Sequence, residues 1–137
     1  MHDIETRKDI EELVADFYQK ALKDKLIGYI FTDVAKIDLA HHRPIIADFW
    51  EMLLFGTVNF QAKYKRSPME VHGALNDKEN LRLEHFARWV KLFAETVDEK
   101  FAGATANLAK VRAVSIAETM RLKFSAKSGA GVPVVRG

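Results

Sequence analysis

Histidine is the residue type in this chain that is best suited to binding a metal ion. Five histidines are present, at positions 2, 41, 42, 72 and 85, and cysteine is absent. A neutral imidazole can bind zinc, nickel or iron. The lack of cysteine excludes iron–sulfur clusters, zinc knuckles and thiolate ligation. A single histidine is more often a surface or core residue than a ligand, so the interpretation depends on the surroundings of each one.

His72 lies within the stretch 67–93, around which the predicted fold is organised. The sequence Ser-Pro-Met-Glu at 67–70 predicts a helix start, because serine caps free backbone N–H groups and proline suits the first helical position. Gly73 predicts that this helix ends after about two turns. A longer helix is predicted over about 77–101, and it carries Phe86, Trp89 and Phe93. A histidine on a short helix that faces an aromatic-rich helix can hold a planar iron cofactor from one side.

The rest of the hydrophobic pattern also has a helical period and predicts an all-α protein. A first helix is predicted to begin near Thr6 or Asp9, whose spacing resembles a capping box, and to fade after residue 25. A second is predicted over about 38–55, with a kink or a preceding turn at Pro44. Residues 56–66 are predicted to form a loop. A final helix is predicted over about 105–124.

The predicted inner faces of these helices bring several candidate residues together. His42 lies on the apolar stripe of the second helix. Tyr18 and Trp89 lie on or beside the stripes of two other helices, where each could aim a polar group at a ligand. The expected apolar lining consists of Phe17, Phe31, Ile46, Phe49, Phe86 and Phe93. By spacing alone, simple packing in a helical core explains Tyr18 and Trp89 better than a binding site does.

Length and composition limit the classes of function. With 137 residues, 48% hydrophobic and 29% charged, the chain is an ordinary globular domain. A net charge of +2 is too small to argue for a nucleic-acid partner. The start is too polar for a signal peptide, and no apolar run is long enough to span a membrane. We therefore expect a cytoplasmic protein with one domain over 1–124 and a flexible tail over 125–137.

Taken in order, the fragments of this sequence resemble the truncated haemoglobins, and specifically their third group. The matching text comprises Phe17-Tyr18, Ile30-Phe31, His42, Phe49-Trp50, Pro68-Met69-x-x-His72, His85-Phe86-x-x-Trp89-x-x-x-Phe93-x-x-Thr96-Val97 and Ser115-Ile116-Ala117-x-x-Met120. The glycine pairs that mark the first two groups are missing, which favours the third. The resemblance covers most of the chain, from the first predicted helix to the last.

The resemblance implies a shortened globin fold, in which two pairs of helices enclose haem b. It implies that His72 is the proximal ligand to the haem iron. Tyr18 and Trp89 would then lie on the distal side as hydrogen-bond donors, and His42 would contact the ligand, coordinate the iron or gate entry. The expected haem contacts are Phe31, Ile46, Phe86 and Phe93, with Lys63 or Arg66 near the propionates unless that basic run is simply solvated.

The function that the resemblance implies is reversible binding of oxygen, and of other small diatomic ligands, at a penta- or hexacoordinate iron. Three alternatives remain open. The first is a haem-dependent redox enzyme, peroxidase-like or a nitric oxide dioxygenase, which needs a reductase partner. The second is a helical-bundle protein in which His42, His72 and His85 bind zinc or nickel. The third is an interaction module without a cofactor.

Overall fold

The structure, a computed structural model, describes residues 1–34, 36, 38–65 and 81–128. Within these ranges every regular element is a helix, which confirms the prediction of an all-α protein. The elements are α1 (Arg7–Ala21), the π-helix η1 (Ile30–Val34), α2 (Leu39–Phe55), α3 (Phe60–Tyr64), α5 (Leu83–Lys100) and α6 (Ala104–Ser128). None of the described helices is both long and apolar enough to cross a lipid bilayer.

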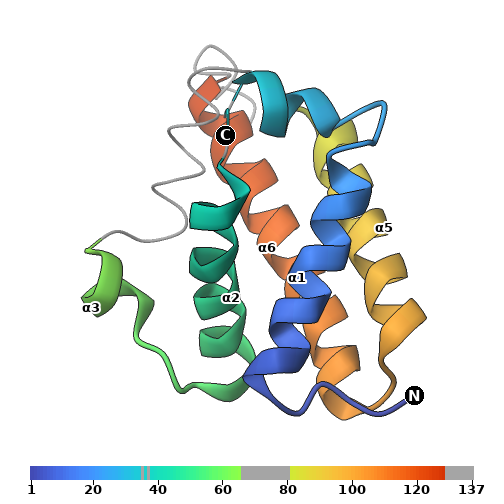
Figure 1. Cartoon of the computed structure of the whole chain (residues 1–137). Coiled ribbons are helices and arrows are strands. Elements are labelled where there is room, and N and C mark those ends of the chain that lie inside the picture. Colours follow the sequence, from blue (N-terminus) through green and yellow to red (C-terminus); the bar gives the residue numbers. More distant parts are fainter. Residues whose placement is uncertain (35, 37, 66–80, 129–137) are drawn as a thin grey trace.

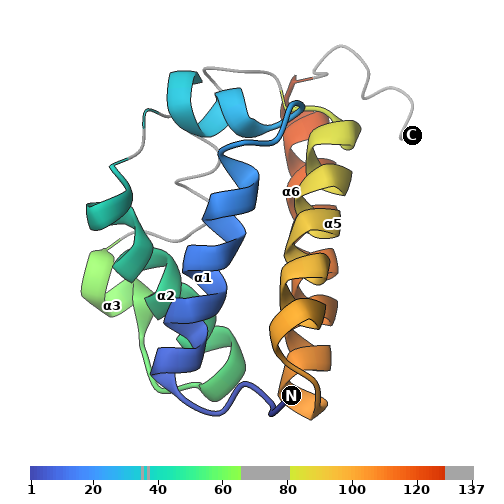
Figure 2. The ribbon, with the colours of Figure 1, turned by 45° about the vertical axis from the view of Figure 1, so that its right-hand side comes forward.

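The four long helices form two antiparallel pairs. Helices α1 and α2 make one pair, and α5 and α6 make the other (Figure 1). Seen after a turn of 45°, the two pairs lie side by side (Figure 2). Helix α1 also packs against α5, and α2 packs against α6, so all four share one apolar core. This arrangement is the two-over-two helical sandwich that the sequence predicts.

Helix α1 begins where the capping signal predicts. The Thr6 side chain accepts a hydrogen bond from the Asp9 backbone N–H, and the Asp9 carboxylate accepts from the Thr6 backbone N–H. This reciprocal pair satisfies donors that a helix start otherwise leaves without partners. The helix ends at Ala21, earlier than predicted, because the Asp24 carboxylate accepts from the Leu26 and Ile27 backbone N–H groups and forms a turn.

Helix α2 has the predicted ends but a different buried face. Asp38 caps its start, and Gly56 ends it in the left-handed conformation at a φ of +71°. Pro44 lies inside the helix, so no separate turn precedes it. The most deeply buried residues are Ala47, Asp48 and Trp50, whereas the predicted stripe is only half-buried. That half-buried stripe consists of Leu39, His42, Ile46, Phe49 and Leu53.

The prediction of a loop over 56–66 is wrong in part, because α3 occupies its second half. Asn59 caps α3 by accepting a hydrogen bond from the Ala62 backbone N–H at 3.0 Å. The predicted short helix around His72 and the predicted start near residue 77 lie outside the described residues. Helix α6 continues to Ser128, so residues 125–128 are helical rather than part of a tail.

The N-terminal segment is fastened to the turn between α5 and α6. The Asp3 carboxylate accepts hydrogen bonds from the Thr105 and Ala106 backbone N–H groups, at 2.9 and 2.8 Å. Asp3 therefore caps α6 from the opposite end of the chain. Gly103 permits the close approach, because a Cβ there would lie 2.5 Å from the Asp3 side chain and its φ is +144°.

We predict that Asp3→Ala lowers the free energy of unfolding by about 1 kcal/mol, the usual cost of a lost N-cap. Burial pulls the pKa of Asp3 upward, but the backbone donors of Thr105, Ala106 and Ile4 lower this pKa overall. The contribution should therefore be complete at neutral pH and disappear as acid protonates the carboxyl group. Urea unfolding at neutral pH measures the loss. Asp3→Asn keeps a hydrogen-bond acceptor and should lose less stability. An Asp3→Ala variant with the stability of the wild type would contradict the capping role.

Candidate functional site

Tyr18 is the centre of a cluster that joins three of the predicted site residues. Its side chain lies on α1 and is 4% exposed. The ring makes edge contacts with Phe31 of η1 and His42 of α2, with centroids 5.6 and 5.8 Å apart. Phe31 and His42 are both half-buried. The structure therefore brings together residues that are separated along the chain but that the sequence assigned to one pocket.

The Tyr18 hydroxyl makes no hydrogen bond within the described part of the chain. Its oxygen still reaches accessible space, since no side-chain polar atom of the described residues is both fully buried and unpaired. Burial raises the pKa of the Tyr18 phenol well above its ordinary value. The phenol therefore keeps its proton throughout the physiological pH range and remains a hydrogen-bond donor.

Trp89 reaches this cluster through a neighbouring ring. It is half-buried on α5, in edge contact with Phe17, with centroids 6.1 Å apart. Phe17 in turn makes an edge contact with Tyr18 at 5.4 Å. The Trp89 indole N–H also makes no hydrogen bond within the described ranges. Phe17 thus contacts two side chains whose donors have no partner among the described residues.

The remaining predicted lining residues occupy two different environments. Ile46 and Phe86 are half-buried, as residues beside a pocket would be. Phe93 is only 2% exposed, and its ring is stacked between Trp50 and Trp89, with centroid distances of 4.6 and 5.6 Å. In the described structure Phe93 is therefore a core residue that supports Trp89 from behind.

His85 has a structural role that the sequence reasoning missed. It is 3% exposed, and its Nδ1 accepts a hydrogen bond from the Arg82 backbone N–H at 2.9 Å, which caps the start of α5. Its Nε2 lies 3.5 Å from the Tyr29 hydroxyl. Among the described residues, the group of potential metal ligands that converges is His2, Glu5 and Asp9, which contains neither His42 nor His85. His72, the third predicted ligand of the zinc or nickel bundle, lies outside the described residues.

Lys63, one of the two predicted propionate partners, belongs to an ionic cluster around Asp48. The Asp48 carboxylate is buried, and it accepts hydrogen bonds from Lys63 at 2.6 Å, Tyr64 at 2.5 Å and Arg7 at 2.6 Å. Burial raises the pKa of Asp48, but these donors prevail and lower it to about 2. The carboxylate thus stays charged and fastens α3 to α2 and to the start of α1. The other propionate candidate, Arg66, lies outside the described residues, as does His72.

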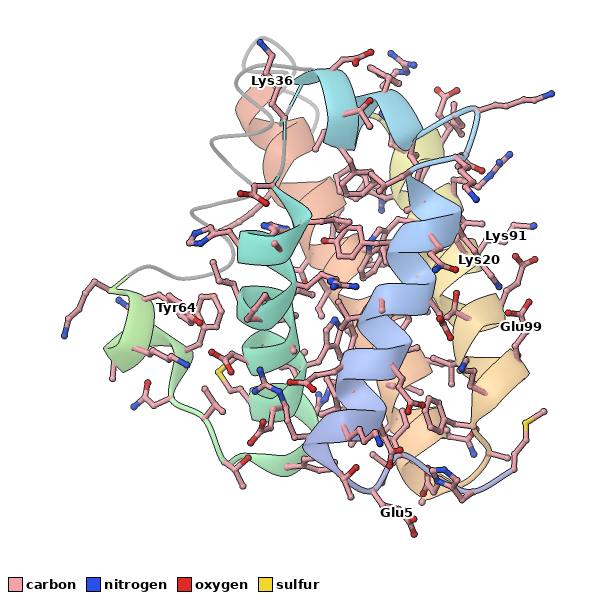
Figure 3. The ribbon with its side chains drawn as sticks, viewed as in Figure 1. Glu5, Lys20, Lys36, Tyr64, Lys91 and Glu99 are labelled. Atoms are coloured by element: carbon pink, nitrogen blue, oxygen red, sulfur yellow. The ribbon has the colours of Figure 1, made fainter. Side chains whose placement is uncertain are left out.

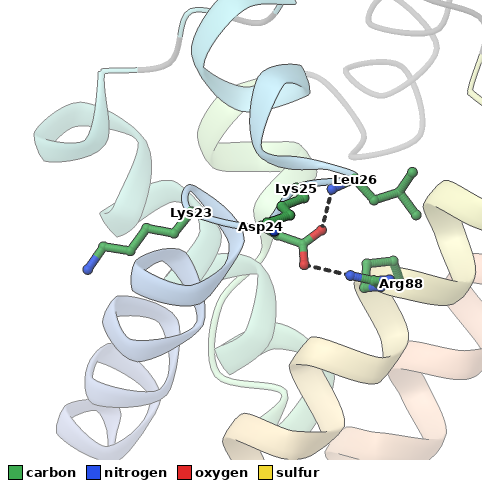
Figure 4. A pocket seen from close by; sticks show the side chains of 5 residues that line it. All are labelled: Lys23, Asp24, Lys25, Leu26 and Arg88. Atoms are coloured by element: carbon green, nitrogen blue, oxygen red, sulfur yellow. Dashed lines mark hydrogen bonds and ion pairs between the residues drawn. The ribbon is translucent and has the colours of Figure 1, made fainter.

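A separate surface hollow adjoins the end of α1 (Figure 4). It is lined by Lys23, Asp24, Lys25, Leu26 and Arg88. Asp24 Oδ1 accepts a hydrogen bond from Arg88 at 2.8 Å, and Oδ2 accepts from the two backbone N–H groups of the turn. The carboxylate is therefore engaged in structural bonds, and none of the predicted site residues lines this hollow.

Comparisons with known proteins agree with the fold. The chain is 29% identical over 114 residues to group 3 truncated hemoglobin ctb of Campylobacter jejuni, a match that covers 81% of this chain and 84% of that protein. It also matches the crystal structure of a group III truncated hemoglobin from Campylobacter jejuni. That match has a TM-score of 0.76 and 27% identity, and covers 90% of this chain and 95% of the other. No protein-family model matches the sequence.

The two antiparallel helix pairs have the truncated, two-over-two globin fold. Within that class its similarity is to the third group of truncated haemoglobins, which confirms the resemblance found in the sequence. The class implies a haem cofactor. The described residues fit such a group, because Tyr18 lies against the half-buried Phe31 and His42, Trp89 lies against Phe17, and neither donor has a hydrogen-bond partner in the described chain.

We predict that Asp48→Asn lowers the free energy of unfolding at neutral pH by roughly 2–4 kcal/mol, since it leaves two cations beside a neutral group. Because the folded pKa of Asp48 is about 2, the native carboxylate contributes fully above about pH 4, the ordinary range of an aspartate, and loses its contribution as the pH falls toward 2. The difference in the free energy of unfolding between Asp48→Asn and the wild type should therefore shrink as the pH falls from about 4 toward 2. Denaturant unfolding at several pH values measures it.

The matched control for this experiment is Asp98→Asn. Asp98 pairs with Lys110 at 2.6 Å but is 61% exposed, so its loss should change stability little. Equal effects of the two substitutions would contradict the role of burial in the Asp48 cluster.

Proposed function

We propose that this chain binds haem b and reversibly binds oxygen and other small diatomic ligands. The observation that carries the proposal is the buried Tyr18 phenol, which makes no hydrogen bond to a described residue and whose ring contacts Phe31 and His42. Because its oxygen reaches accessible space, the phenol can donate a hydrogen bond to a molecule that binds beside it. The similarity to group III truncated haemoglobins supports the same assignment.

We assign the cofactor contacts as the sequence predicts, apart from Phe93. His72 is the proximal ligand, and Lys63 and Arg66 lie near the haem propionates. Lys63 already pairs with Asp48, so a propionate would share its ammonium group with that carboxylate. The apolar contacts are Phe31, Ile46 and Phe86, whereas Phe93 supports Trp89 from behind. When bound, the haem iron supplies a coordination position for a diatomic ligand and gives that ligand partial negative charge.

The distal side chains stabilise that charge. Tyr18 keeps its proton because burial disfavours the phenolate, so it donates to the ligand at any physiological pH. Trp89 has only a donor, its indole N–H, and cannot accept. His42 touches the Tyr18 ring from α2 and is half-buried, which suits either coordination or gating. Two donors that face one small ligand favour firm retention over rapid release.

A second candidate function is haem-dependent redox catalysis, peroxidase-like or as a nitric oxide dioxygenase. Firm retention of oxygen suits chemistry on the ligand better than bulk delivery. The enzyme would need a reductase as its partner, because no second redox cofactor is implied by the sequence. The same distal donors would serve both functions, so ligand-binding kinetics alone do not separate them.

We predict that the protein expressed with a supply of haem shows a strong Soret band, and that His72→Gly loses it. Added imidazole should restore the band, because it replaces the missing ligand without the covalent link. Ultraviolet–visible spectroscopy measures both effects. The ligand-free ferrous spectrum of the same preparation reports whether His42 coordinates the iron, since six-coordinate low-spin iron requires a second internal ligand. A colourless wild type that takes up no haemin would refute the haem assignment.

We also predict that Tyr18→Phe and Trp89→Phe each accelerate oxygen release from the ferrous protein. A hydrogen bond to a charged acceptor contributes about 1.5–3 kcal/mol, and 3 kcal/mol corresponds to roughly a hundredfold in rate. Stopped-flow displacement of oxygen measures the rate. Tyr29→Phe is the control, because the described ring contact of Tyr29 is with His85 and not with Tyr18 or Trp89, so this variant should leave release unchanged. Unchanged rates in both distal variants would exclude the donor role.

A further inference from the structure

Six aromatic rings form a continuous series from Trp89, beside the proposed haem site, to the surface. The series runs Trp89, Phe93, Trp50, Phe49, Phe60 and Tyr64. Successive ring centroids are 5.6, 4.6, 5.7, 6.1 and 4.7 Å apart. Both tryptophans of the chain belong to it, together with one of the three tyrosines. We call this series the aromatic path.

The inner part of the path is well arranged for electron transfer. Trp89 and Phe93 are stacked with an interplanar angle of 13°, and Phe93 and Trp50 with one of 14°. Phe93 and Trp50 are each 2% exposed, so water does not separate these rings. Electron tunnelling weakens steeply with distance, and stacked rings shorten the gap between the two indoles. Indole is readily oxidised, whereas the benzene ring of Phe93 serves only as a bridge.

The outer end of the path carries a group that can lose an electron and a proton together. Phe60 is 5% exposed, whereas Tyr64 is half-buried on α3, at the edge of the molecule (Figure 3). The Tyr64 hydroxyl donates to the buried Asp48 carboxylate at 2.5 Å. Oxidation turns a phenol into a strong acid, so a hydrogen-bonded carboxylate makes that oxidation easier by accepting the proton. Tyr18, by contrast, has no acceptor in the described chain.

We propose that the aromatic path conducts oxidising equivalents from the haem pocket to Tyr64, where a bulky one-electron reductant that cannot enter the pocket is oxidised. This inference rests on the proposed haem site and extends its redox function. The site would thereby act on two classes of molecule. A small peroxide would be reduced inside the pocket, and a large reductant, such as a reduced redox protein, would be oxidised at the surface beside α3.

The electrons and protons balance as follows. One hydrogen peroxide molecule takes up two electrons and two protons at the haem and yields two water molecules. Each electron reaches the pocket through Trp89 and Trp50 from Tyr64, which passes its proton to Asp48. The external reductant then returns one electron to Tyr64, and Asp48 returns the proton to the phenol oxygen. Two reductant molecules are oxidised for each peroxide consumed, and the two protons come from solvent.

The test uses the intact haem protein and traps the radical that oxidation should form on Tyr64. Ferric protein is mixed with hydrogen peroxide and 2-methyl-2-nitrosopropane, and the labelled residue is located by peptide mass spectrometry. We expect the adduct on Tyr64 in the wild type and in the control Tyr29→Phe, whose ring has no described contact with the path. Trp50→Phe keeps an aromatic ring but removes the oxidisable indole, so labelling of Tyr64 should fall at least tenfold.

A second variant keeps the proposal testable if Trp50→Phe fails to fold. Tyr64→Phe should slow peroxide-driven oxidation of reduced cytochrome c, which is too large for the pocket, at least tenfold. Oxidation of a small phenol that enters the pocket should continue. If the protein shows a Soret band but carries the label on Tyr18 instead of Tyr64, the aromatic path is wrong and the haem proposal stands. The same conclusion follows if the label on Tyr64 is undiminished in Trp50→Phe. A protein that binds no haem lacks the source of oxidising equivalents and overturns both proposals.

Discussion

The structure depends on helix α1, whose adjacent residues Phe17 and Tyr18 pack against different parts of the molecule. Consecutive residues on an α-helix point about 100° apart, so adjacent side chains can face different partners. Phe17 points toward α5, where it meets Trp89, and Tyr18 points toward η1 and α2, where it meets Phe31 and His42. Helix α1 thereby fixes the position of α5 relative to η1 and α2. A rotation of α1 that improved one contact would spoil the other.

Ionic interactions, rather than this apolar packing, determine the position of α3. Asp48 is buried on α2, and burial of a carboxylate is unfavourable unless cations and donors surround it. Arg7, Lys63 and Tyr64 supply these groups from α1 and α3. Because α3 has only five residues, it has little helical stability of its own. The ionic cluster therefore determines the position of α3 relative to α1 and α2.

The sequence predicted those features that arise from local patterns. The capping box at Thr6 and the left-handed stop at Gly56 are short-range signals, and the structure has both. Helix α3 was missed because five residues give too little periodicity, although Asn59 was a usable cap signal. The cap that Asp3 provides joins residues far apart in the chain, and no local pattern encodes it.

His85 was considered as a ligand because residue type alone does not show that its Nδ1 already accepts a backbone hydrogen bond. The grouping of the pocket residues came from the ordered resemblance to a family and not from periodicity.

The fastening of the N-terminus over the α5–α6 turn has a consequence for the order of folding. The pairing of α5 with α6 is local in sequence and can form early, whereas the bond between Asp3 and Thr105 joins residues 102 positions apart. The cap on α6 therefore belongs to the last stage of assembly. Interactions that form after the transition state govern how fast a protein opens and not how fast it forms. Loss of the Asp3 cap is therefore expected to speed unfolding and to leave the rate of folding nearly unchanged.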